Sequence, residues 1–139
     1  MKNKYRPNRN ITNSLFKSIK DLIEISKHAP EDLRKSMSDR EFKKDFATIR
    51  IQMPRRLGNT TLAKKLLEDS KSTVYVTAAS NCKELDREYR GRCFSLINLD
   101  RRLRGVDFDI LIADCASCIP DKDIDTIYNM PAKIFVFLG

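Results

Sequence analysis

The feature that most constrains this chain is the alternation of short apolar runs with helical segments after residue 46. Strand-like runs at 47–53, 73–78, 93–97, 108–113 and 133–138 are separated by helix-like segments at 60–70, 81–89 and 123–128. Three of the strand-like runs are almost continuously apolar, which is typical of strands buried on both faces. Parallel strands need crossover connections, usually helices. We therefore predict an α/β fold with a mostly parallel sheet and helices on both faces.

The N-terminal third of the chain has a different pattern. Residues 1–10 are basic and polar, which suggests a flexible arm. Helical spacing then predicts a helix from an N-cap at Thr12 or Asn13 to about His28. A second helix is expected to begin at Pro30 and a third at Ser38 or Asp39, because proline, serine and aspartate are typical of helix starts. The predicted organisation is a basic arm at 1–10, a helical extension at 11–45 and a core at 46–139.

Length and composition restrict the class of protein. The chain has 139 residues, of which 41% are hydrophobic and 33% charged, as expected for one globular domain. No apolar run is long enough to span a bilayer, and no apolar segment follows the basic N-terminus as in a secretory signal. We therefore expect a cytoplasmic protein that does not contact membranes, with its four cysteines as thiols.

The charge is unevenly distributed along the chain. Residues 1–46 hold 12 basic and 7 acidic side chains, residues 47–105 hold 13 and 6, and residues 106–139 hold 2 and 6. A basic body suits a polyanionic partner, so we expect binding to nucleic acid, DNA in particular. A merely solvated, basic surface remains an alternative, because charge does not identify the partner.

The segment after the first strand has the layout of a phosphate-binding loop. Residues 53–67 are MPRRLGNTTLAKKLL: a tight basic turn that closes on Gly-x-Thr-Thr, then a helix. Such a loop binds phosphates through backbone N–H groups and the helix N-terminus. Gly58 matches the second glycine of the Walker A pattern and Thr60 its magnesium-binding hydroxyl. Met53 stands in place of the first glycine and Asn59 in place of the lysine, so one positive charge is missing.

Two arginines inside the loop offer a replacement for that charge. Arg55 and Arg56 could bind phosphate, since a guanidinium does so bidentately. The residues expected to bind the nucleotide are Pro54, Arg55, Arg56, Leu57, Gly58, Asn59, Thr60 and Thr61. Considered alone, the loop leaves open an ordinary strand–turn–helix connection in which Gly58 permits a positive φ and Thr60 only caps the helix.

A second element strengthens the nucleotide interpretation. The apolar strand at 108–113 ends in Asp114, which is the layout of a Walker B motif, where a carboxylate holds magnesium. The loop and the acid occur in the expected order, with elements between them that can build a sheet. We therefore predict a P-loop NTPase type of fold that binds ATP and Mg²⁺, with Thr60 and Asp114 as metal ligands and Arg55, Arg56 and Asp114 as catalytic candidates.

The two motifs resemble those of one known family. MPRRLGNTT is similar to the phosphate loop of the large terminase subunits of tailed phages and herpesviruses, and DFDILIADCASCIP is similar to their second motif. The resemblance covers roughly residues 42–139. It implies an ATPase core linked to viral DNA packaging or other DNA handling, in the host cytoplasm, with a viral protein partner or a homo-oligomer.

The chain also departs from the family pattern. Family members have a lysine at the position of Asn59 and a catalytic glutamate at that of Cys115. A thiol does not replace that carboxylate as general base, so hydrolysis is expected to be weak or absent. The chain is also too short for a complete packaging motor. The alternative is an inactive pseudo-ATPase that binds nucleic acid or a protein partner.

Other candidate sites are weaker. Cys115 and Cys118 form a CxxC, which is half of a zinc site or a redox pair, but no zinc-like spacing completes it. The arginines at 101, 102 and 104 could contact DNA phosphates or reach a neighbouring subunit's nucleotide, although a solvated charge run is the simpler interpretation. His28, the one histidine, is expected to cap a helix or to be solvated.

Overall fold

The computed structural model describes residues 9–29, 31–52, 59–78 and 82–139. Five strands form one sheet in which every neighbouring pair is parallel, in the order β1-β5-β4-β2-β3. The strands are β1 (Thr48–Ile51), β2 (Thr73–Thr77), β3 (Cys93–Ser95), β4 (Ile110–Asp114) and β5 (Ile134–Leu138). The predicted α/β class with a parallel sheet is therefore confirmed, and β4 lies at its centre between β5 and β2.

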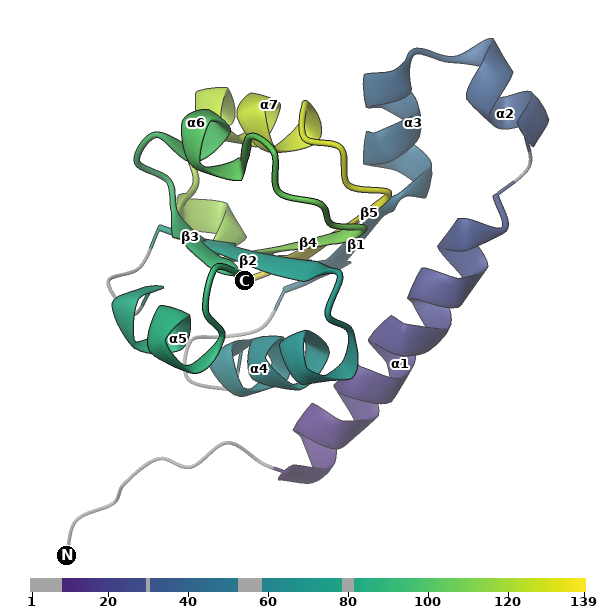
Figure 1. The fold of residues 1–139 in the computed structure, drawn as a ribbon. Helices are drawn as coiled ribbons and strands as arrows, with labels where there is room; N and C mark the ends of the chain where they lie inside the picture. Colours follow the sequence, from purple (N-terminus) through teal and green to yellow (C-terminus); the bar gives the residue numbers. More distant parts are fainter. Residues whose placement is uncertain (1–8, 30, 53–58, 79–81) are drawn as a thin grey trace, which may run out of the picture.

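Helices cover both faces of this sheet (Figure 1). One face packs against α1 (Arg9–Lys27), α4 (Asn59–Asp69) and α5 (Cys82–Glu88). The other packs against α6 (Leu99–Leu103) and α7 (Asp121–Tyr128), and α3 (Asp39–Phe46) lies beside α7 at the β1 end. The short α2 (Glu31–Ser36) joins α1 to α3, and a single 3₁₀ turn, η1 (Ala116–Cys118), precedes α7.

Two apolar clusters, one on each face, form the core. The first joins alternate residues of the central strands, such as Tyr75 and Ile112, to Leu62 and Leu66 of α4 and Ile19 of α1. The second joins the intervening strand residues to α6 and α7. Because both faces are covered, all five residues of β2, β4 and β5 are buried, which explains their continuous apolar character.

The helical extension is part of this packing. Ile19 and Ile23 of α1 are buried in the first cluster, and the hydroxyl of Ser38 accepts the backbone N–H of Glu41 as the predicted cap of α3. The helix start predicted at Thr12 or Asn13 is wrong, because Arg9 and Asn10 are already helical. For the same reason, the last two residues of the predicted basic arm belong to α1. Among the described residues, no helix is long and apolar enough to cross a membrane.

Two elements were not predicted. Helix α6 is only five residues long, and its two leucines at 99 and 103 are its buried residues. The 3₁₀ turn η1 follows Cys115, which adopts a left-handed conformation with φ 54°. The remaining predicted helices and strands are present, with ends that differ by a few residues. The predicted helix start at Pro30 lies outside the described residues.

Candidate functional site

Asp114 is a predicted site residue with two hydrogen bonds to described residues. It ends the central strand β4 and is 2% exposed. Its Oδ2 accepts a hydrogen bond from the hydroxyl of Tyr75 on β2, and its Oδ1 accepts the backbone N–H of Cys115 at 2.8 Å. A carboxylate has about four acceptor positions, and the described residues occupy one on each oxygen.

The strand ends bring Asp114 to the same part of the sheet as the start of α4. Asp114 pairs in register with Thr77 and Leu138, the last residues of β2 and β5, and the N–H of Gly139 donates to the carbonyl of Ile51 at 2.9 Å. The carboxyl ends of all these strands therefore form one edge. Helix α4 leads from β1 back to β2, so its N-terminus lies at this edge too.

The carboxylate and α4 also share a face. Side chains alternate along a strand, so Asp114 projects to the same side as Ile112, which packs with Tyr75 against Leu62 and Leu66 of α4. One strand, β5, separates β1 from β4, which places their ends roughly 10 Å apart.

Most of the predicted phosphate loop lies outside the described residues, including Pro54, Arg55, Arg56, Leu57 and Gly58. Helix α4 begins at Asn59. Thr60 in its first turn is half-buried, whereas Thr61 is exposed. The predicted magnesium ligands, Thr60 and Asp114, are thus placed on one face and at one edge of the sheet.

The CxxC follows Asp114 directly. Cys115 is half-buried and Cys118 is exposed. The N–H of Cys118 donates to the carbonyl of Cys115 at 2.8 Å, and that of Ser117 donates to the carbonyl of Gly139 at 3.0 Å. These bonds tie η1 to the end of β5. Among the described residues, no three His, Cys, Asp or Glu side chains are grouped so as to hold a metal ion.

The other basic candidates lie away from this carboxylate. Arg101 and Arg102 are exposed on α6, and Arg104 follows it. Helix α6 covers the face opposite to Asp114, so these arginines do not approach that carboxylate from within the chain. His28 is exposed just after α1, as predicted for a solvated side chain.

Sequence reasoning missed the partner of Asp114. Tyr75 is fully buried in the middle of β2, where a tyrosine is an ordinary strand residue. Its role depends on the register that pairs Tyr75 with Ile112, two residues before Asp114. Comparison of the chain with protein families, with curated proteins and with solved structures gives no match.

Proposed function

We propose that this protein binds ATP with Mg²⁺ at the carboxyl edge of the sheet and serves in viral DNA packaging or other DNA handling. The observation that supports this most directly is the position of Asp114. A carboxylate ends the central strand on the same face and edge as the N-terminus of α4. Ligands of open parallel α/β sheets bind at this edge, outside the carboxyl ends of the strands.

In this proposal different residues bind the phosphates and the metal ion. The backbone of residues 54–60 and the first turn of α4 hold the phosphates. Arg55 and Arg56 replace the positive charge that Asn59 does not provide. The hydroxyl of Thr60 and the carboxylate of Asp114 hold the metal, which neutralises phosphate charge when bound. The hydrogen bonds to Tyr75 and Cys115 orient the carboxylate toward a metal-bound water.

We expect hydrolysis to be slow because the residue after Asp114 is a cysteine. General bases contribute about 10²- to 10⁴-fold to a rate. Replacement Cys115→Glu would place a carboxylate at the position of the base in the family that the motif resembles. An increase of at least about tenfold in ATP turnover, measured as phosphate release, would indicate that the site lacks only this group. Cys118→Glu, an exposed position three residues away, is the matched control.

The decisive test of binding is calorimetry with ATP in the presence and absence of Mg²⁺. We expect saturable binding by the wild type that depends on Mg²⁺, and a loss of at least about tenfold in affinity for Thr60→Val and Asp114→Asn. Thr126→Val is the control, because Thr126 lies on α7 over the opposite face of the sheet, and this variant is expected to bind like the wild type. Circular dichroism would establish that each variant is folded.

Absence of binding by the folded wild type at millimolar ATP would contradict the proposal. The basic surface would then be the better candidate for function. In that case affinity for a DNA duplex should fall steeply as salt is raised, because each phosphate contact releases counterions.

A further inference from the structure

A groove lies on the opposite side of the sheet from the carboxylate of Asp114, between α3 and α7. Its volume is 740 Å³, within the range of about 300–1,000 Å³ typical of small-molecule sites. Its floor includes Phe137 of β5 and Tyr128 of α7. Its charged and hydroxyl side chains are Arg40, Lys44, Arg50, Ser117, Asp121 and Asp125. All these residues are described, and none of them belongs to the predicted phosphate loop.

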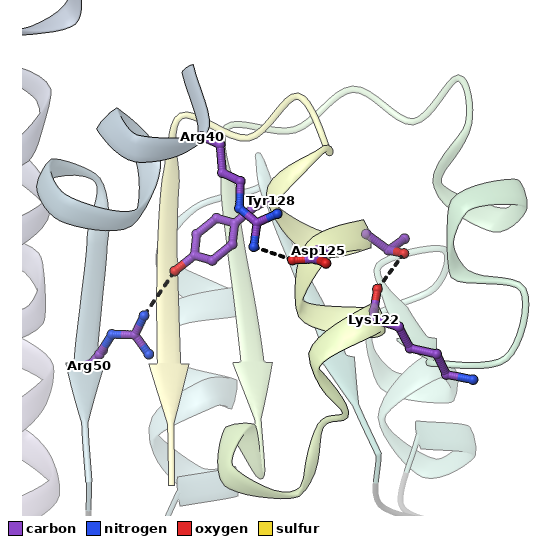
Figure 2. Close-up of polar contacts among 6 residues, drawn as sticks. Arg40, Arg50, Lys122, Asp125 and Tyr128 are labelled. Atoms are coloured by element: carbon purple, nitrogen blue, oxygen red, sulfur yellow. Dashed lines mark hydrogen bonds and ion pairs between the residues drawn. The ribbon is translucent and has the colours of Figure 1, made fainter. Parts of the chain in front are cut away.

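A chain of hydrogen bonds fixes Arg50 at the side of this groove, and Figure 2 shows the last of them, from Arg50 to the hydroxyl of Tyr128. The hydroxyl of Thr48 donates its single proton to the carbonyl of Lys43 at 2.7 Å. Tyr128 must therefore donate its own proton to Thr48, at 3.0 Å. The oxygen of Tyr128 then accepts the guanidinium of Arg50 at 3.1 Å. The donor and the acceptor of each of these three bonds are therefore determined, and Arg50 is the first donor of the chain.

The positive charge of Arg50 is held by uncharged groups. Its guanidinium lies 5.0 Å from the centre of the Phe137 ring and donates to the neutral hydroxyl of Tyr128. Within the described parts of the chain, no carboxylate forms an ion pair with Arg50 or with Lys44. A guanidinium has five N–H donors in a rigid fork, so most of those of Arg50 remain available to a ligand.

Arg40, the third basic side chain of the groove, is paired with a carboxylate. Arg40 of α3 forms an ion pair with Asp125 of α7 and so joins the two helices across the groove (Figure 2). The opposite charges of Arg40 and Asp125 cancel, so this pair adds no net charge to the groove. Among the other side chains of the groove, the charged ones are the basic Lys44 and Arg50 and the exposed, acidic Asp121, so two basic side chains face one acidic one.

These features are better explained by a ligand than by stability alone. Structural arginines usually gain their stabilisation from a carboxylate or from several carbonyls, as Arg92 does with three carbonyl groups in this protein. Among the described residues Arg50 has neither, yet the hydroxyl of Tyr128 and the ring of Phe137 orient it. We propose that the groove between α3 and α7 is an anion site that binds a phosphate group, with Arg50 as the bidentate donor and Lys44 as the second cation. Arg50 and Phe137 lie on the face of the sheet opposite to Asp114, and the groove reaches the carboxyl edge of the sheet at Ile51 and Gly139; its proposed donors, Arg50 and Lys44, differ from those of the ATP site.

The test is a titration followed by ¹⁵N-resolved NMR, with inorganic phosphate and ADP as separate probes at constant ionic strength. We expect saturable shifts at the amides of residues 50–52, 117 and 139. Arg50→Gln should weaken binding about ten- to a hundredfold. Arg50→Lys, which keeps the charge and loses the fork, should give an intermediate loss. Lys44→Gln, at an exposed position, should weaken binding several-fold.

The control variant is Arg102→Gln, which removes an exposed arginine of α6 outside the groove. It should bind phosphate like the wild type. Tighter binding of ADP than of phosphate, lost in Arg50→Gln but retained in Asp114→Asn, would identify a nucleotide as the source of the phosphate group; equal binding would identify free phosphate. Shifts that do not saturate by about 20 mM phosphate, twentyfold above a 1 mM dissociation constant, would overturn the proposal. Equal losses of phosphate affinity in Arg50→Gln and Arg102→Gln would also overturn the proposal.

Discussion

The hydroxyl of Tyr75 donates a hydrogen bond to the carboxylate of Asp114 inside the sheet, between the neighbouring strands β2 and β4. Both side chains are almost fully buried. A buried carboxylate is costly unless it is hydrogen-bonded, so this contact allows an acid to end the central strand. It also fixes the direction of the carboxylate at the edge where we propose that a metal binds.

We predict that Tyr75→Phe lowers the free energy of unfolding by about 1.5–3 kcal/mol, the usual value for a hydrogen bond to a charged group. Urea denaturation of Tyr75→Phe, Asp114→Asn and the double variant would measure the coupling between the two residues. A coupling energy of at least about 1 kcal/mol is expected for a direct contact. Additive losses would show that the hydroxyl and the carboxylate do not interact.

A second prediction concerns Arg92, which joins the end of α4 to the start of β2. Its guanidinium donates to the carbonyls of Leu67 and Ser70, each at 2.6 Å, and to that of Thr73 at 2.9 Å. Arg92→Gln should cost about 2–4 kcal/mol, since partly buried carbonyls at a helix end would lose charged donors. Thermal and urea unfolding would measure this cost, and Arg90→Gln, at an exposed neighbour, should change stability by less than about 0.5 kcal/mol.

A third prediction concerns Lys43, which holds the end of α7. Its amino group donates to the carbonyls of Tyr128 at 2.9 Å and Met130 at 3.0 Å, where a cation also interacts favourably with the helix dipole. Lys43→Met keeps the length of the side chain and should lower the free energy of unfolding by about 1–3 kcal/mol. Lys44→Met on the exposed side of α3 is the control. Equal stabilities of the two variants would contradict this role for Lys43.

The fold was largely predictable because its strands are buried on both faces. The runs TVYVT and IFVFL have no polar alternation that could be mistaken for a surface strand, and helical segments separate the strands. Helix α6 was missed since its apolar signal is limited to Leu99 and Leu103, amid charged residues. The start of α1 was misplaced because Arg9 and Asn10 have no apolar spacing to indicate a helix.

Of the candidate site, only the acid at the end of a buried strand could be predicted from the sequence. Asp114 follows an apolar run, so its place at the edge of a parallel sheet follows from local pattern. Its partner Tyr75 depends on the register between two strands, and the contact of Arg50 with Tyr128 joins residues 78 positions apart. No local spacing encodes either contact, because both arise from the order of strands in the sheet.

A fourth prediction concerns the loss of stability at high pH that Tyr89 should cause. The hydroxyl of Tyr89 donates to Glu68 at 2.6 Å, and burial together with this carboxylate raises the pKa of Tyr89 well above its usual value near 10. The folded state therefore keeps a proton that the unfolded state loses above about pH 10, so stability is complete below that pH and falls as pH rises further. Urea unfolding between pH 9 and 11 should show a shallower fall for Tyr89→Phe than for the wild type; equal slopes would exclude this contribution.

The last prediction is a substitution that should stabilise the protein. Thr73 begins β2 and is 1% exposed, and its hydroxyl has no hydrogen-bond partner among the described residues. A buried hydroxyl without a partner costs about 1–3 kcal/mol, whereas valine has nearly the same shape and favours strands. Thr73→Val should therefore raise the free energy of unfolding by about 1 kcal/mol, measured by urea denaturation. Thr48→Val is the matched control: its hydroxyl bonds both Lys43 and Tyr128, so the same substitution should destabilise the protein. A loss of stability in Thr73→Val would mean that this hydroxyl is hydrogen-bonded in solution.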